Sequence, residues 1–217
     1  PCYHFLATTW AAYLARMGIE VELEMVRPGF YPRGGGEIRA VIHPCSRVNG
    51  VSLLSCPELT TASGFSAFAE LPESVGKKQA RRLSVRLKSA GVEPHIPVEE
   101  WRAASPGSVA AVVFRQPPVP ALFFGLGERG KPSEAVADDA ADEAIAFREA
   151  KAPVDPHSAD QLLLPLAFSA DASEYRVSEV TRHLTTNVET VRQFVDRSIS
   201  VEEGEGKSGI VRVAARV

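Results

Sequence analysis

The spacing of apolar and polar residues along the chain predicts alternating helices and strands. Residues 4–17 have the apolar spacing of a helix, and Gly18 follows as its stop signal. Two strand-like runs come next, 19–26 and 38–42. The elements expected after them are strands at 51–54 and 62–69, a helix at 73–90 closed by Gly91, strands at 108–115 and 119–126, helices at 133–150 and 156–169, a strand at 174–180, a helix at 187–196 and two closing strands. This mixture of helices, strands and hairpins indicates an α+β fold.

The segment GFYPRGGGE, residues 29–37, joins the first two strand-like runs. Glycine permits positive φ and close approach of two backbones, so a hairpin turn is the simplest interpretation. Arg27 and Arg33 stand beside unshielded backbone N–H groups, which allows a second interpretation, a cradle for phosphate. The segment matches neither the GxGxxG nor the GxxxxGK[ST] pattern of nucleotide-binding loops. The periodicity of the flanking runs therefore favours the hairpin.

The composition of the 217 residues, 45% hydrophobic and 24% charged, is ordinary for a globular protein with one or two cores. No run approaches the roughly 18 apolar residues of a membrane span, and no signal peptide opens the sequence, so we expect no membrane partner. Cys2, Cys45 and Cys56 are odd in number and lack CxxC spacing. They fit a reducing cytoplasm and argue against structural zinc, which predicts a cytoplasmic protein.

The charged residues are unevenly distributed, although the net charge of −3 gives no general attraction to nucleic acid. Residues 77–88 are strongly basic, whereas 134–174 are mostly acidic. A basic helix usually presents a solvated face, and this one lacks interleaved aromatic residues. Contact with RNA is the second interpretation of residues 77–88.

The helix predicted at 156–169 carries a polar face. Asp155 is a good N-cap, and Pro156 suits the first helical position. Positions i, i+3, i+4 and i+7 place four residues on one face: His157, Asp160, Gln161 and Leu164. Three leucines point elsewhere and are expected in the core: Leu162, Leu163 and Leu166. The polar face is either a solvated surface or a functional site; HxxD alone offers only two metal ligands.

A second histidine lies next to a predicted helix start. Thr186 and Glu189 fit a capping box, with Thr186 as N-cap and the helix beginning at Asn187. A helix N-terminus attracts anions, so His183 just before it can present a ring nitrogen to a bound phosphate. Its neighbour Arg182 adds positive charge near such a phosphate. A half-buried histidine that ends a strand would fit the same pattern.

Three segments carry a family resemblance: GFYPRGGGE at 29–37, HSADQLLLP at 157–165 and HLTTN at 183–187. In order and spacing they resemble the glycine-rich signature, the ADQL-type helix and the HLxTN segment of the RNA 3′-terminal phosphate cyclases. The chain resembles roughly the C-terminal two-thirds of that family. The resemblance implies an α+β fold: the last βαβαββ-type unit of the cyclase core, carrying an inserted smaller α/β domain.

The resemblance also implies a division of the chain. Residues 1–47 and 151–217 would form the discontinuous core unit, and 48–150 the inserted domain with its own sheet. We further expect the strands at 19–26 and 36–43 to share a sheet with the strands after residue 170.

The function implied is ATP-dependent conversion of an RNA 3′-phosphate to a 2′,3′-cyclic phosphate. His183 matches the nucleophile that takes AMP from ATP, and a divalent cation, Mg²⁺, would neutralise the triphosphate. Five further positions match the nucleotide site: His157, which replaces an aromatic residue that stacks on adenine, Asp160, Gln161, Phe124, and Pro1 on the other adenine face. We expect His157, Asp160 and His183 to face one cleft, with Phe124 on its wall. The expected partners are ATP and RNA 3′-phosphate ends.

The sequence leaves other functions open. A non-catalytic cyclase-like protein of ribosome biogenesis keeps the fold without the nucleophile, and the HLxTN context of His183 argues against it. An inactive fragment and a stand-alone α+β binding module are also compatible with the sequence. In the family, N-terminal units supply arginines and a histidine for the phosphates, and this chain has no counterpart of them. We therefore expect little activity from the chain alone, and an N-terminal partner polypeptide if the enzyme is split.

Overall fold

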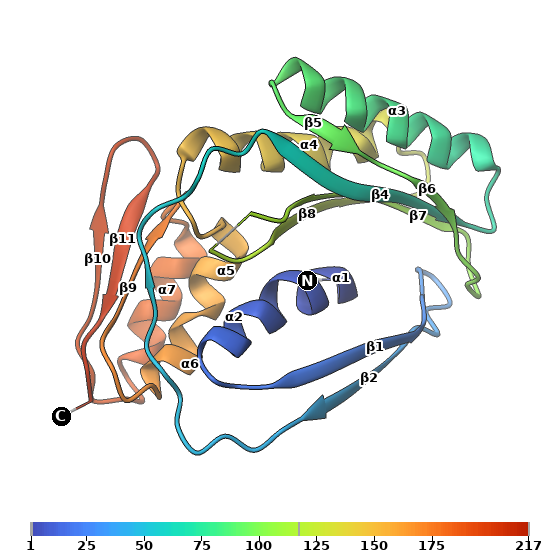
Figure 1. Ribbon diagram of the computed structural model, residues 1–217. Helices are drawn as coiled ribbons and strands as arrows, with labels where there is room; N and C mark the ends of the chain where they lie inside the picture. Colours follow the sequence, from blue (N-terminus) through green and yellow to red (C-terminus); the bar gives the residue numbers. More distant parts are fainter. Residues whose placement is uncertain (1, 117, 217) are drawn as a thin grey trace.

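The strands of the protein form three separate sheets in the computed structural model, which describes residues 2–116 and 118–216 (Figure 1). A two-stranded sheet contains β1 (Val21–Arg27) and β2 (Glu37–Ile42). A five-stranded sheet is built from residues 61–126, and a four-stranded sheet joins residues 52–53 to the C-terminal strands. The α+β prediction is confirmed. No helix within 2–116 and 118–216 has the length and apolar character needed to cross a lipid bilayer.

The N-terminal helix is one continuous rod made of α1 (Tyr3–Phe5), the π-helical η1 (Leu6–Trp10) and α2 (Ala11–Arg16). Gly18 follows with a φ of +82°, so the predicted glycine stop is confirmed. The helix lies between the β1–β2 hairpin and the five-stranded sheet (Figure 1). Its buried Thr9 accepts a hydrogen bond from the backbone of Leu122 across 3.1 Å, which fixes the helix to the sheet.

The glycine-rich segment is a hairpin connection, as the periodicity predicts. β1 and β2 pair antiparallel, and Gly34 and Gly35 have φ values of +64° and +73°. Arg27 donates to the carbonyl of Gly35 at 2.7 Å and pairs with Glu37 at 2.9 Å. The hairpin itself therefore engages Arg27, one of the two arginines that a phosphate cradle would use.

The five-stranded sheet has β4 (Thr61–Ala69) near its centre. β7 (Gly107–Phe114) and β8 (Ala121–Leu126) follow antiparallel on one side, and β5 (Glu93–His95) and β6 (Val98–Glu100) pair parallel with β4 on the other. α3 (Glu73–Ser89) and α4 (Ser133–Ala150) cover one face of this sheet (Figure 1). The sequence did not predict β5 and β6, because these three-residue strands are too short for alternation to appear.

The basic face of α3 is paired with the acidic face of α4. Arg82 and Arg86 both bind the carboxylate of Asp138, at 2.8 Å and 2.6 Å, and Arg86 also pairs with Asp142. These contacts raise the pKa of both guanidinium groups and lower the pKa of Asp138 through hydrogen bonds. Part of the basic run at 77–88 therefore serves helix–helix packing.

The four-stranded sheet has the order β10-β11-β9-β3. Its strands are β3 (Ser52–Leu53), β9 (Ser173–Val177), β10 (Ile199–Glu203) and β11 (Gly209–Val213). Three helices pack on it: α5 (Pro156–Gln161), α6 (Leu163–Ala167) and α7 (Arg182–Val191). The leucines that the helical spacing placed in the core, Leu162, Leu163 and Leu166, are fully buried here.

Three expectations about the fold are wrong. Within the described residues β2 pairs with β1 alone, so the hairpin shares no sheet with the strands after 170. The helix expected at 156–169 is divided at Leu162 into α5 and α6. The helix expected at 187–196 begins at Arg182 and ends at Val191. The domain division at 48 and 150 stays a prediction.

Candidate active site

The start of α7 places His183 inside the helix rather than before it. Thr181 is the N-cap, and its hydroxyl oxygen accepts a hydrogen bond from the Leu184 amide at 3.2 Å. The capping box assigned to Thr186 is therefore wrong. The apolar face of α7 explains the difference, because Leu184, Val188 and Val191 are buried at helical spacing and require the helix to begin earlier.

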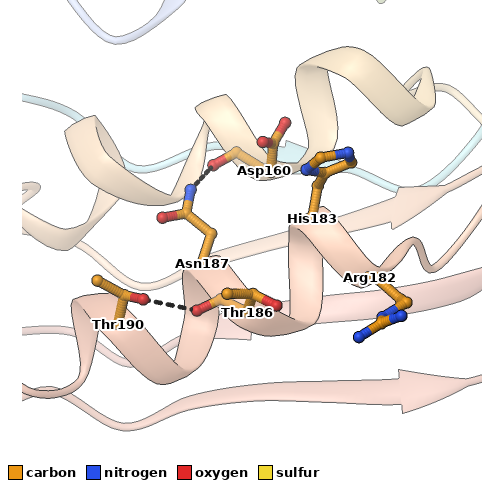
Figure 2. A pocket seen from close by; sticks show the side chains of 6 residues that line it. All are labelled: Asp160, Arg182, His183, Thr186, Asn187 and Thr190. Atoms are coloured by element: carbon orange, nitrogen blue, oxygen red, sulfur yellow. Dashed lines mark hydrogen bonds between the residues drawn. The ribbon is translucent and has the colours of Figure 1, made fainter.

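An open pocket of about 480 Å³ lies between α5 and the first turns of α7. Its lining residues are Asp160, Arg182, His183, Thr186, Asn187 and Thr190. Figure 2 shows the His183 ring on the same side of α7 as Asp160. The amides of Arg182 and His183 belong to the first turn, whose N–H groups lack partners within the helix and favour anions. The structure thus brings together two of the predicted site residues, Asp160 and His183.

The N-terminus of α5 is fixed by a buried carboxylate. Asp155 accepts hydrogen bonds from the amides of His157 and Ser158, at 3.0 Å and 2.9 Å, and from the Ser158 hydroxyl at 2.6 Å. Pro156 occupies the first helical position, so the predicted cap is confirmed. Burial raises the pKa of Asp155, although its hydrogen bonds with Ser158 act in the opposite direction. This cap orients the helix that carries Asp160 into the pocket.

A hydrogen bond connects the two helices of the pocket. The side-chain amide of Asn187 donates to the backbone carbonyl of Asp160 at 2.7 Å (Figure 2). Thr190 donates to the carbonyl of Thr186 at 2.8 Å on the same side of α7. The sequence did not predict Asn187 and Thr190 as lining residues. Their spacing from His183, i+4 and i+7, reveals a shared face only once the helix is known to begin at Arg182.

Arg182 belongs to the pocket wall but points away from His183. Figure 2 shows its guanidinium extending in a different direction from His183 and Asp160. The observed rotamer therefore does not place positive charge beside the His183 ring.

His157 is not part of this pocket lining. Its Nε2 lies 3.0 Å from a carboxylate oxygen of Glu143 on α4, and this hydrogen bond raises the pKa of His157. Gln161 donates its side-chain amide to the His157 carbonyl at 2.7 Å, one helical turn away. The His157 side chain remains 53% exposed. His157 and Gln161 therefore make contacts within the chain that the sequence did not predict.

Phe124 lies on β8 and packs against a small apolar cluster. This cluster contains Phe5, Val113 and Leu122, which join the N-terminal helix to the sheet. Phe124 is partly exposed and does not line the pocket of His183. Pro1, the other predicted adenine contact, lies outside the described residues.

The pocket contains one carboxylate, Asp160. In the described part of the chain, no cluster of three or more His, Cys, Asp or Glu side chains is arranged to hold a metal ion. The HxxD pair at 157 and 160 therefore gains no third ligand from these residues.

Comparison with known proteins shows which family this chain belongs to. The family model described as RNA 3′-terminal phosphate cyclase matches residues 1–201. The chain belongs to this family. The cyclase family resemblance of the three sequence segments is thereby confirmed.

Curated relatives with this name agree with the match. The chain is 33% identical over 205 residues to the RNA 3′-terminal phosphate cyclase of Trichormus variabilis, covering 94% of this chain and 59% of the relative. The cyclase of Gloeothece citriformis is 32% identical over 194 residues, 89% of this chain and 55% of the relative. The cyclase of Methylococcus capsulatus is 33% identical over 214 residues, 98% of this chain and 59% of the relative. The chain thus spans less than two thirds of the length of these relatives.

Proposed function

We propose that this chain carries the adenylate-accepting site of an RNA 3′-terminal phosphate cyclase. The proposed reaction is the ATP-dependent conversion of an RNA 3′-phosphate to a 2′,3′-cyclic phosphate. The observation that carries it is the position of His183, in the first turn of α7 and in one open pocket with Asp160. Membership of the cyclase family supplies the substrate class.

In the proposed first step an unprotonated nitrogen of the His183 imidazole attacks the α-phosphorus of ATP. A nitrogen–phosphorus bond forms, and the bond to the bridging oxygen breaks, so that pyrophosphate leaves with the electron pair. The free amides and dipole at the start of α7 would stabilise the charge on the phosphoryl oxygens. We assign Asp160 to accept the other ring N–H of His183, which would keep the attacking nitrogen unprotonated.

Two further transfers complete the proposed reaction. The RNA 3′-phosphate oxygen attacks the AMP on His183, which breaks the nitrogen–phosphorus bond and frees the imidazole. The neighbouring 2′-hydroxyl then attacks the 3′-phosphorus, loses its proton, and expels AMP. The product is the 2′,3′-cyclic phosphate. Magnesium bound to the triphosphate would neutralise its charge, and Asp160 is the pocket residue able to contact that ion.

The adenine contacts in this proposal rest on the resemblance of the sequence motifs. The His157 ring is 53% exposed despite its bond to Glu143, so one ring face remains available for stacking on a base. Gln161 follows on the same helix, while Phe124 and Pro1 would reach the nucleotide from other parts of the chain. In this proposal residues 48–150 are the inserted domain, and RNA 3′-phosphate ends and ATP are the partners.

Covalent labelling tests the nucleophile. The test protein is this chain joined to the part of the Trichormus variabilis relative that lies outside the match, incubated with α-labelled ATP and Mg²⁺. We expect an acid-labile, alkali-stable protein–AMP adduct, as for a phosphorus–nitrogen bond. His183→Ala is expected to abolish it, and His95→Ala, at an exposed histidine outside the pocket, to leave it intact.

Each outcome is informative. Equal labelling of the His183→Ala variant would show that His183 is not the nucleophile. A joined protein that folds and never labels would instead favour the non-catalytic cyclase-like function. For the 217-residue chain alone, we expect little or no labelling.

A further inference from the structure

Asp160, the carboxylate of the pocket, is carried by a helix that is too short to fix its position alone. α5 has six residues, and isolated helices of this length are unstable in water. The helix ends at Gln161 because Pro165, four residues later, has no N–H to donate to the Gln161 carbonyl. The position of Asp160 therefore depends on contacts with other elements.

Two of these contacts reach the peptide groups on either side of Asp160. The hydroxyl of Tyr175 donates to the carbonyl of Ala159 at 2.9 Å. The side-chain amide of Asn187 donates to the carbonyl of Asp160 at 2.7 Å (Figure 2). The first carbonyl belongs to the peptide group before the Asp160 Cα, and the second belongs to the peptide group after it. Because two planar peptide groups that meet at a Cα set the direction of its Cα–Cβ bond, the two hydrogen bonds together orient the Asp160 side chain.

Tyr175 is a rigid anchor for this arrangement. It lies in β9, where it pairs with Val211 of β11 on one side and with Leu53 of β3 on the other, and it is fully buried. Burial, together with the charge of Asp160, raises the pKa of Tyr175 above its ordinary value. The hydroxyl therefore stays protonated near neutral pH and remains a hydrogen-bond donor.

The hydroxyl of Tyr175 has no role in filling the core. A phenylalanine ring would occupy the same space between the sheet and the helices, and a buried hydroxyl is costly unless it is hydrogen-bonded. The packing of β9 thus needs the ring, whereas the hydroxyl serves the contact with α5.

We infer that Tyr175 is a positioning residue for the transfer of AMP to His183. Through the Ala159 carbonyl it holds Asp160 in the orientation in which the carboxylate accepts the ring N–H of His183. Asn187, one helical turn after His183 on α7, acts on the peptide group at the other side of Asp160. Tyr175 is fully buried and is not one of the lining residues, so it acts without touching the nucleotide. The inference rests on the roles proposed above for Asp160 and His183.

The tautomer of the His183 ring tests this inference without any nucleotide. A carboxylate that accepts one ring N–H favours one tautomer of a neutral imidazole, and the NMR chemical shifts of the ring nitrogens report which of them carries the proton. In the 217-residue chain at about pH 8.5, where imidazole is neutral, we expect one tautomer to exceed the other about tenfold or more.

Two variants and a control separate positioning from stability. Tyr175→Phe removes only the hydroxyl and is expected to lower the tautomer ratio about threefold or more. Asn187→Ala, which frees the other peptide group, is expected to change the ratio in the same direction. The control is Val211→Ala, which leaves a cavity beside Tyr175 in the neighbouring strand. It is expected to lower the melting temperature and to keep the tautomer ratio of the parent chain.

Labelling kinetics extend the test to the reaction. In the joined protein, Tyr175→Phe is expected to slow adduct formation at saturating ATP about tenfold, while the ATP concentration for half-maximal rate changes less than about twofold. Val211→Ala is expected to label at the parent rate below its melting transition.

An unchanged tautomer ratio in Tyr175→Phe would overturn the inference, and so would a parent chain without a dominant tautomer. An equal change in Val211→Ala would also overturn it, because the hydroxyl would then act only through stability. Normal labelling by Tyr175→Phe would have the same consequence. If the joined protein never labels, the proposed function fails, while the tautomer ratios still decide whether Tyr175 positions Asp160.

Discussion

The Asn187 side chain donates a hydrogen bond to the backbone carbonyl of Asp160 across 2.7 Å, and this bond joins α7 to α5. Asp160 and His183 lie on different helices, so their common pocket depends on how these helices are held together. Buried leucines pack beneath them, and the Asn187 bond connects the two helices at the pocket itself.

Asn187→Ala is expected to lower the free energy of unfolding by about 1–2 kcal/mol, because a partly buried carbonyl loses its donor. Urea denaturation followed by circular dichroism measures the change. Gln193→Ala is the control, since Gln193 is exposed near the end of α7 and is expected to change stability little. Equal stability of Asn187→Ala and the parent chain would show that the bond contributes nothing to joining the helices.

Asp155→Ala is expected to lower stability by about 1–2 kcal/mol, because α5 loses its N-cap. Asp155→Asn is expected to lose less, since its amide oxygen still accepts from the backbone. A difference in the opposite direction, with Ala more stable than Asn, would contradict the capping role. Chemical denaturation at pH 7 measures the stability of the parent chain and of the Asp155→Ala and Asp155→Asn variants.

The effect of Asp155 on the pH dependence of stability has a defined sign. Burial raises the pKa of Asp155 in the folded state above the unfolded value of about 3.9. Between those two values the folded state binds more protons, so ionisation of Asp155 lowers stability as pH rises. Asp155→Asn is expected to remove this fall from a pH series of denaturation curves, and an unchanged series would contradict the assignment.

The contact between His157 and Glu143 makes a small part of the stability depend on pH. The hydrogen bond that His157 donates to the Glu143 carboxylate raises the folded pKa of His157. Its contribution to stability is therefore complete below the unfolded pKa of about 6.5 and is lost as pH rises through the folded pKa. With both side chains about half exposed, that contribution is under about 1 kcal/mol. NMR titration of the His157 ring is expected to show a lower pKa in Glu143→Gln. Glu149→Gln, at an exposed position of the same helix, is the control and is expected to leave the titration unchanged.

The contact between Phe30 and Gly107 predicts a non-additive pair of variants. A Cβ atom added at Gly107 would overlap the ring of Phe30, which brings the glycine-rich loop against β7. Gly107→Ala is therefore expected to cost about 1–3 kcal/mol of stability through overpacking. Phe30→Ala removes the obstacle, so the double variant is expected to be more stable than the sum of the single effects predicts. Additive losses would show that the two residues do not oppose each other.

Local sequence determined most individual elements of this protein. The helix at 133–150 has the predicted bounds, and Asp155 and Pro156 begin α5 because a capping side chain and a fixed proline φ act within a few residues. The glycine-rich hairpin was predictable for the same reason. The family motifs also pointed to Asp160 and His183, and these two residues do lie in one pocket.

Tertiary structure decided where α7 begins, which strands pair and which side chains of different helices meet. The start of α7 depended on which threonine caps the helix, and the burial of Leu184, Val188 and Val191 selected Thr181 over Thr186. The sequence could not predict the partners of each strand, because the alternation in β2 suits any sheet. In the folded chain β2 pairs with β1, whereas β9 pairs with β11 and β3. The bond between His157 and Glu143 joins residues that periodicity assigned to different helices. Such pairings depend on contacts between distant segments, and a linear pattern records only the face that each segment buries.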